Sequence, residues 1–359
     1  MSLSPLKWLD SLPAPKGALE EVQRRGRESL ITLGLPTSSC ETWRLTDLDR
    51  LRALLDLPVY SGVKEQKSEQ APSRNTWPIT PSKGFRLVVD STGKSIDPST
   101  LPKGFTVLTP DELRQALGRT LQRCECNSEW AVEVNHASAT EVLALRVNGR
   151  VPSLELVMPA CPNEFSATRV VLILEEKADL ELLQMVLGCG SSAQSHVLEI
   201  YLAHGASLSH GWVALGGGEG SLLGHLTIEQ EPKSNYCLTT IHHGWALGRV
   251  EPRLVQLHGQ ADTSIKGLQI TRGVEQAATH SYVRFDGPEG SLDQLNKSVA
   301  TNRSHSIFNG AISVPRAAQK TNASQLSRNL LLSTHACIDT KPELEIIADD
   351  VRCQHGATI

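Results

Sequence analysis

Apolar residues follow two different spacings in the two parts of the chain. In the first 60 residues they lie three or four positions apart, which is the spacing of one face of an α-helix. One such set comprises Leu19, Val22, Gly26, Leu30 and Leu33. Gly34 and Pro36 follow it and supply a stop signal. The pattern predicts an N-terminal helical region over residues 1–60.

A second helix is predicted within that region. Thr46 and Asp49 resemble a capping box ahead of an apolar run, and Pro58 ends the helix. Residues 61–84 are polar and contain several prolines, which is typical of a linker. The linker separates the helical region from everything that follows.

Residues 85–129 mix the two kinds of pattern. A strand is predicted over 85–90, where the sequence reads FRLVVD. A helix is predicted to begin after Thr109, with Pro110 in its first turn and Glu112 completing the cap. We therefore expect a short mixed α/β segment.

From about residue 130 to 359, short β-type runs alternate with turns of small and polar residues, and few helical patterns remain. Small-residue turns that open a strand occur at Ala178, Ala206, Ser234, Ala261, Gly290, Ser313 and Ala336. They are 28, 28, 27, 29, 23 and 23 residues apart. A period of 20–30 residues without helices favours a β-solenoid core, in which each coil stacks on its neighbours. A β-sandwich with evenly spaced turns is the alternative.

The composition supports the solenoid. Of 359 residues, 40% are apolar but only 4% are aromatic, so the core must be built from aliphatic side chains. Stacked identical coils suit aliphatic ladders. The net charge of −4 shows no basic excess, so neither nucleic acid nor a membrane surface is an expected partner.

The location in the cell can also be predicted. The N-terminus has no apolar run followed by a cleavage pattern, and no 18-residue apolar stretch occurs anywhere in the chain. The eight cysteines are scattered rather than arranged as a disulfide framework. We expect a cytoplasmic protein with reduced thiols.

Catalytic signatures are missing. The sequence contains no phosphate-binding loop, dinucleotide fingerprint, nucleophile elbow or paired zinc-ligand spacing. Cys124 and Cys126 are too few to close a zinc site, and adjacent His242 and His243 would face opposite ways on a strand. Neighbouring coils carry histidines that could align as one site or lie separately as surface residues: His196, His204, His210 and His225.

Cys353 and His355 form the best local pair. They are two positions apart, so both side chains leave the same face of a strand. A thiolate beside an imidazole suits iron, zinc or a nascent iron–sulfur cluster, but two ligands leave such a site incomplete. If the pair is functional, another surface must supply the remaining ligands. The alternative is a buried structural cysteine with an exposed histidine at a strand end.

Several motifs resemble the SufB/SufD family of iron–sulfur cluster assembly scaffolds. Residues 314–358 contain AQKTNA, NLLLS, DTKPELEI, ADDV and C-x-HGAT, which are similar to the family's C-terminal signature. ETWRLTDL at 41–48 resembles the N-terminal motif of the SufD branch, and 144–160 resembles the start of the family's core domain. The similarity extends over nearly the whole chain.

The resemblance implies a right-handed parallel β-helix core flanked by helical segments. It also implies a complex in which SufB and SufD join through their β-helices and SufC alone binds ATP. The family's functional histidine falls on His355 and the adjoining cysteine on Cys353. Iron or a nascent cluster would be held transiently at the SufB interface. A non-catalytic scaffold subunit without a tightly bound cofactor of its own is therefore expected.

One departure concerns the C-terminus. The family continues past HGAT into a helical region that contacts SufC, whereas this sequence stops at Ile359, which puts SufC binding by this chain in question. Whether the isolated chain forms a homodimer is a question that the sequence leaves open. Two other functions also stay open: a SufB paralogue that carries the nascent cluster, and a β-helix polysaccharide lyase or hydrolase.

Overall fold

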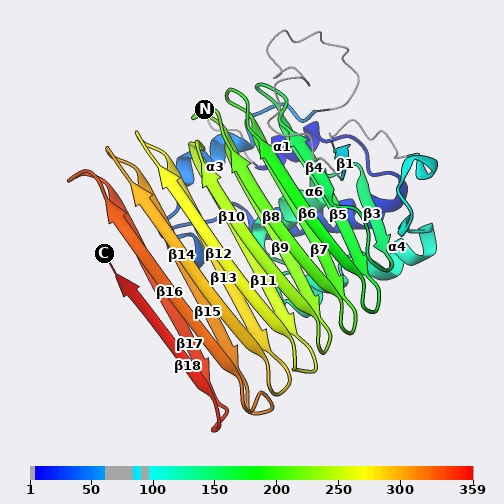
Figure 1. Ribbon diagram of the computed structural model, residues 1–359. Coiled ribbons are helices and arrows are strands. Elements are labelled where there is room, and N and C mark those ends of the chain that lie inside the picture. Colours follow the sequence, from blue (N-terminus) through cyan, green and yellow to red (C-terminus); the bar gives the residue numbers. More distant parts are fainter. Residues whose placement is uncertain (1–4, 61–83, 90–96, 359) are drawn as a thin grey trace.

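The computed structural model describes residues 5–60, 84–89 and 97–358, and the predicted linker lies almost wholly outside them. Most of the chain forms a β-solenoid, drawn as two facing sheets in Figure 1. The strands are β1 (Phe85–Val88), β2 (Phe105–Val107), β3 (Val142–Val147), β4 (Leu154–Pro159), β5 (Phe165–Leu174), β6 (Asp179–Leu187), β7 (Ala193–Leu202), β8 (Ser207–Leu215), β9 (Ser221–Gln230), β10 (Asn235–His243), β11 (Leu247–Gln256), β12 (Asp262–Thr271), β13 (Gln276–Phe285), β14 (Ser291–Ala300), β15 (His305–Val314), β16 (Asn322–Leu331), β17 (Cys337–Ile346) and β18 (Arg352–Thr358). The expectation of a mainly β solenoid is confirmed.

Successive strands alternate between the two sheets. Sheet A has the order β2-β3-β5-β7-β9-β11-β13-β15-β17, and sheet B has the order β1-β4-β6-β8-β10-β12-β14-β16-β18. Neighbouring strands within each sheet are parallel, except for the antiparallel pair β2–β3. Each coil therefore adds one strand to each sheet. The last strands of the described chain are β17 in sheet A and β18 in sheet B.

The turns explain the sequence period. The strands of sheet B from β6 onward begin at residues 179, 207, 235, 262, 291, 322 and 352. The five expected turns from Ala178 to Gly290 each stand directly before such a start, and most contain a fully buried small residue after a residue of positive φ, such as Lys177–Ala178 and Lys233–Ser234. One expected turn was wrong, because Ser313 lies inside β15, whereas Ala336 does stand directly before a strand, which is β17 of sheet A. From β14 onward each coil is longer than the earlier ones, whereas the spacing of the expected turns predicted shorter coils.

The interior combines two kinds of ladder. One aliphatic column runs through sheet A in register from coil to coil: Leu172, Ile200, Ile228, Leu254, Val283, Ile312 and Leu344. One column of sheet B changes from apolar to polar along the chain: Leu182, His210, Leu238, Ile265, Gln294, Gln325 and His355. Buried glutamine, serine and asparagine side chains thus replace much of the apolar core in the last coils.

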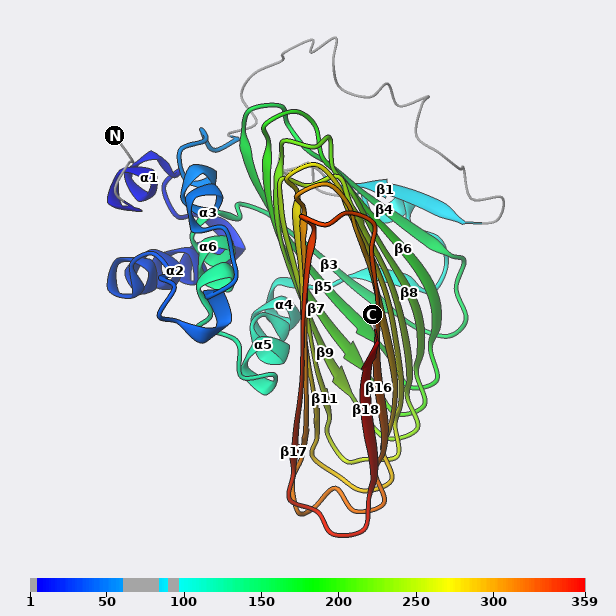
Figure 2. The ribbon, with the colours of Figure 1, turned by 90° about the vertical axis from the view of Figure 1, so that its left-hand side faces the viewer.

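The helices lie beside the solenoid on the outer face of sheet A (Figure 2). They are α1 (Pro5–Ser11), α2 (Glu20–Leu33), α3 (Leu48–Leu54), α4 (Pro110–Ala116), α5 (Arg119–Arg123) and α6 (Trp130–Ser138), with short 3₁₀ turns η1 (Gly17–Leu19), η2 (Glu41–Trp43) and η3 (Pro98–Thr100). Helices α5 and α6 contact β7 and β9, and α2 packs on α6. The helices cover the early and middle coils and leave the last ones open.

Local predictions had mixed outcomes. Helix α2 ends at Leu33 before Gly34, and Thr109 with Glu112 forms the expected capping box of α4. The cap of α3 is Asp47, whose carboxylate accepts from the Arg50 amide, so the assignment to Thr46 was wrong. The prediction that the β-core begins at residue 130 was also wrong, because α6 comes first. All nine residues of α6 are buried between α2 and the sheet, so the helix has no exposed polar face to reveal it in the sequence pattern.

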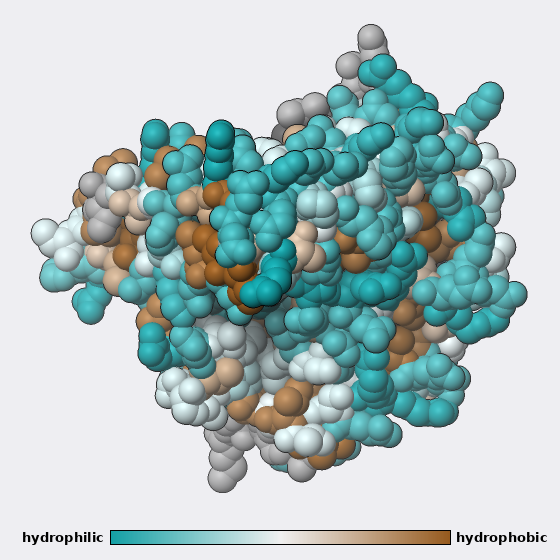
Figure 3. Space-filling model, turned by 90° about the horizontal axis from the view of Figure 1, so that it is seen from below, coloured by the Kyte–Doolittle hydropathy of each residue, from teal (hydrophilic) through white to brown (hydrophobic). Residues whose placement is uncertain are grey.

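The surface is consistent with the modest net charge. Viewed from below, it is mainly hydrophilic, and apolar residues gather in separate areas (Figure 3). Among the described residues, none of the helices is both long and apolar enough to span a lipid bilayer.

Gly26 tests the contact between α2 and α6. A Cβ at this position would lie 2.6 Å from both the Ala137 amide nitrogen and the His136 Cβ. We expect Gly26→Ala to lower the unfolding free energy by about 1–3 kcal/mol, because the collision outweighs the better helix propensity of alanine. Chemical denaturation measures this. Glu28→Ala, on the exposed face of the same helix, should change it by less than about 0.5 kcal/mol. An equal effect of both substitutions would contradict the packing argument.

Candidate functional site

Strand β18 carries the predicted pair into the last coil. Cys353 and His355 stand in register with Ala323 and Gln325 of β16, which are 1% and 2% exposed and face the interior. In-register residues of parallel strands share a face, so the Cys353 and His355 side chains also point inward. Cys353 is half-buried against the core, whereas His355 is exposed, since β18 is the last strand of sheet B in the described chain.

The pair offers one sulfur and one nitrogen atom as candidate metal ligands. Burial raises the pKa of the Cys353 thiol, and a backbone hydrogen bond with Ala323 partly opposes the shift. The thiol is therefore protonated at neutral pH and becomes a good ligand only when a cation displaces its proton. His355 supplies a nitrogen donor next to this sulfur. Such a soft pair fits iron or an iron–sulfur cluster, which needs further ligands from outside the pair.

Exposed apolar side chains flank the open coil. Leu330, Leu331 and Leu332 lie where β16 ends, and Ile346 and Ile347 lie where β17 ends; all five are at least 40% exposed. The outer edges of β17 and β18 also present backbone groups without a neighbouring strand in the described chain. Unpaired edges and apolar contacts of this kind favour association with another protein.

The other candidate histidines do not form a joint site in the described structure. His196 contacts Thr168 and Gln194 inside the solenoid, whereas His210 contacts Tyr236 and Gln184. These two are buried rather than at the surface, and so is His225, but His204 is exposed. His242 is buried inside, while its neighbour His243 points outward and bonds to the Ile270 carbonyl, as the strand alternation predicts.

Cys124 and Cys126 behave as structural thiols. Both are buried beneath α5, with their sulfurs donating to backbone carbonyls. Burial raises the pKa of Cys124 to about 12. A thiol that stays protonated is a poor ligand and a poor nucleophile.

Sequence reasoning missed a charged cluster between the helices and sheet A. Glu129, the residue before α6, lies 3.4 Å from His225 Nε2 and 2.8 Å from the Arg253 guanidinium. Arg253 also reaches Glu251 at 2.9 Å, and Arg249 reaches Glu251 at 2.5 Å. Two arginines already balance the two carboxylates, so a divalent cation would meet competing charge. The cluster fastens α6 to the sheet.

A second missed cluster lies on the outer face of β15 and β17. The His305 Nε2 and Asp339 Oδ2 atoms are 2.6 Å apart, and the Cys337 sulfur is 3.6 Å from the same oxygen. The Gln276 amide nitrogen donates to His305 Nδ1, and its oxygen accepts from the Asp47 amide, which fixes its orientation. The His305 proton is therefore on Nε2 and donates to Asp339. The nitrogen that faces the cluster has no lone pair for a metal.

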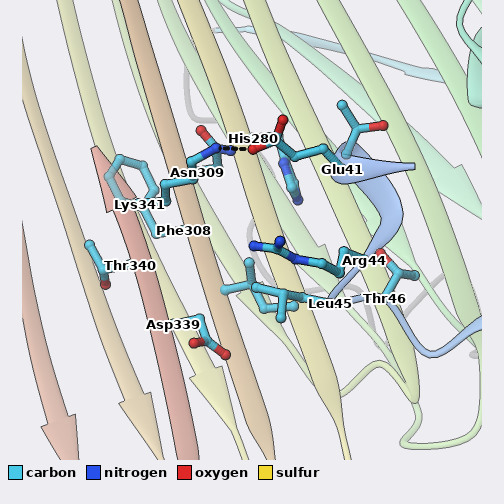
Figure 4. Close-up of a pocket in the computed structure, with 12 residues that line it drawn as sticks. Glu41, Arg44, Leu45, Thr46, His280, Phe308, Asn309, Asp339, Thr340 and Lys341 are labelled. Atoms are coloured by element: carbon cyan, nitrogen blue, oxygen red, sulfur yellow. Dashed lines mark hydrogen bonds and ion pairs between the residues drawn. The ribbon is translucent and has the colours of Figure 1, made fainter. Parts of the chain in front are cut away.

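The N-terminal motif at 41–48 lies across the outer face of sheet A. A cavity of about 340 Å³ separates residues 41–46 from β13, β15 and β17 (Figure 4). Across it, Lys341 donates to the Glu41 carboxylate at 2.5 Å. The Arg249 guanidinium lies 4.1 Å from the ring centroid of Trp43. The motif therefore ties the helical region to sheet A as far as β17.

The alternation of residues along two strands could have predicted part of both missed clusters. Arg249, Glu251 and Arg253 occupy every second position of β11, and Cys337 and Asp339 do so in β17. Alternation alone predicts that they share a face. It does not predict which helix covers that face, because Glu129 before α6 and Asp47 before α3 come from distant parts of the chain.

Comparison with known proteins gives a consistent family signal. A sequence model of the SUF system FeS cluster assembly SufBD core domain matches residues 157–359. An iron–sulfur cluster assembly SufBD family protein of Synechocystis is 28% identical over 94% of this chain and 79% of its own length. The iron–sulfur cluster assembly protein SufD of Escherichia coli is 25% identical over 92% of this chain and 78% of its own length. SufD of Bacillus subtilis is 42% identical over 32% of this chain and 28% of its own length.

The buried histidines predict how stability depends on pH. Burial lowers the pKa of His210 from 6.5 to about 3, so below pH 6.5 the unfolded chain takes up a proton that the folded chain rejects. Stability should fall as pH decreases from about 6.5 towards 3. His210→Gln should reduce this slope by about 1.4 kcal/mol per pH unit between pH 6 and pH 4.

Urea denaturation at several pH values measures the slope. Gln354→Ala replaces an exposed side chain that carries no titratable group and should keep the wild-type slope. An unchanged slope in His210→Gln would mean that the folded protein accommodates the charged imidazole.

Proposed function

Because the chain belongs to the SufBD family of iron–sulfur cluster assembly proteins, we propose that it is a scaffold subunit without catalytic activity of its own. In this proposal its last coil pairs with a SufB subunit, and a SufC subunit binds and hydrolyses ATP. Iron or a nascent cluster is the cargo, held at the junction by Cys353 and His355. The complex would work in the cytoplasm.

The half-site at the open coil is the observation that carries this proposal. Cys353 and His355 offer one sulfur and one nitrogen donor at the last strand of sheet B. A protein that completed a metal site by itself would bring further ligands to that strand. Among the described residues, neither of the two clusters of three or more ligand-type side chains includes either residue. A partner that extends the solenoid would place its own ligands opposite them.

The exposed apolar residues support pairing at the same end. A second β-solenoid could continue the unpaired edges of β17 and β18 and cover Leu332, Ile346 and Ile347. The N-terminal motif also reaches this end of the solenoid, since the exposed Glu41 carboxylate pairs with Lys341 of β17.

Similarity to proteins named SufD favours a SufD-like role over that of a SufB paralogue. Family membership also argues against a polysaccharide lyase or hydrolase. Co-expression with SufB and SufC partners separates the first two roles, because a SufD-like chain should recruit SufB, whereas a SufB-like chain should recruit SufD.

His355 provides the direct test. In a complex co-expressed with SufB and SufC partners, His355→Ala should lower the cluster absorbance in visible spectra by about tenfold or more, because the nitrogen that would bind the cluster is lost. The unfolding free energy should change by less than about 0.5 kcal/mol, since the side chain is exposed.

Gln354→Ala is the matched control, because Gln354 is exposed on the opposite face of the same strand. It should keep the full absorbance. Normal cluster formation in His355→Ala would refute the assigned role.

The pairing surface has its own test. The double substitution Ile346→Glu with Ile347→Glu should weaken SufB binding about tenfold or more, because two charges would be buried against the partner. Co-purification and titration measure the loss. Val274→Glu is the control: Val274 is 63% exposed in the turn between β12 and β13, away from the last coil. Undiminished binding of the double variant would exclude this surface.

A further inference from the structure

A column of polar side chains inside sheet B leads directly to His355. Gln294 of β14, Gln325 of β16 and His355 of β18 are in register in three successive coils. Gln294 and Gln325 are each 2% exposed, whereas His355 is exposed. Buried amides are therefore stacked beneath the terminal imidazole.

The amides form a directed chain of hydrogen bonds. Gln294 Nε2 donates to Ser281 Oγ at 2.7 Å, and Gln325 Nε2 donates to Gln294 Oε1 at 3.0 Å. Gly310 of β15 makes room for the second amide, because a Cβ there would lie 2.2 Å from Gln325 Nε2. The nitrogen of Gln325 thus points to the preceding coil, and its oxygen is left for the following one.

That oxygen has no partner. Gln325 Oε1 is buried and makes no hydrogen bond in the described structure. A buried carbonyl oxygen without a donor is costly, and native proteins rarely leave one in that state. The next side chain in the column is His355, which is exposed and whose ring has no hydrogen bond within the described chain.

We propose that Gln325 is a positioning residue for His355. Gln325 Oε1 accepts a hydrogen bond from one ring N–H of His355, which holds the imidazole in one tautomer. The other ring nitrogen then keeps its lone pair and faces away from Gln325, towards the open end of the coil. Hydrogen bonds of this kind orient the ring and raise the basicity of histidines that bind metals. The metal-binding part of this inference rests on the proposed function, whereas the hydrogen bond does not.

The hydrogen bond can be observed by NMR in the full chain without partners or iron. In ¹⁵N-histidine-labelled protein at pH 8, the His355 ring N–H should be protected from exchange with water and visible; the His355→Ala spectrum assigns it. Gln325→Met keeps the side-chain length but removes the amide acceptor, and should abolish the signal. Gln325→Glu retains an acceptor and should restore it.

Asn329→Leu is the matched control. Asn329 faces the interior from the same strand but bonds to Thr340 in a different column, so its loss should leave the His355 signal in place. A wild-type spectrum without a protected ring N–H, or one that survives in Gln325→Met, would overturn the proposal.

The consequence for metal binding is measured separately. In the assembled complex, Gln325→Met should lower cluster yield and weaken Fe²⁺ affinity by about 10- to 100-fold, with rescue by Gln325→Glu. If the NMR signature is present but His355→Ala still builds clusters, the proposed function fails and the positioning role stands. If His355→Ala abolishes clusters and Gln325→Met keeps the ring N–H, the positioning role fails alone.

Discussion

Parallel register fixes which side chains meet inside this solenoid. Each residue stacks on its equivalents in the neighbouring coils, so neighbours in a column must fit in size, and a buried polar side chain needs a hydrogen-bond partner, as His210 finds in Tyr236 and Gln184. The aliphatic column from Leu172 to Leu344 meets this condition throughout sheet A. Small residues such as Ala178 and Ala206 meet it at the corners, where the chain bends after a residue of positive φ. One misplaced coil would put polar groups into the apolar stack.

A solenoid satisfies this constraint everywhere except at its ends. The first described coils are closed by the antiparallel pair β2–β3 and by the helices. Within the described residues the last coil has no equivalent cover, and the edges of β17 and β18, the exposed isoleucines and the Cys353–His355 pair occur together there. In the proposed function, one contact with a partner would cover this end and complete the ligand set of Cys353 and His355.

The helices pack on the outer face of sheet A, where charged side chains make part of the contact. This face carries charges at alternate positions, and the helical region covers several of them: Glu129 pairs with Arg253, and the Thr42 carbonyl accepts from the Arg249 guanidinium. The Glu41–Lys341 pair, by contrast, is exposed. Partly buried pairs such as Glu129–Arg253 add little net stability but penalise any other docking geometry. The N-terminal motif can therefore hold the helical region in one position along the solenoid while most of sheet B is left free of helices.

The coil period up to Gly290, the helix α2, the cap of α4 and the shared face of Cys353 and His355 could be predicted from the amino-acid order, because each depends on neighbours a few residues apart. The family resemblance was also present in the sequence. Three features became visible only in the folded chain: the coils lengthen after β14, residues 130–138 form a buried helix, and Gln325 lies beneath His355. Those facts depend on contacts between residues about 30 or more positions apart, and register across such distances is set by the packing of the whole stack.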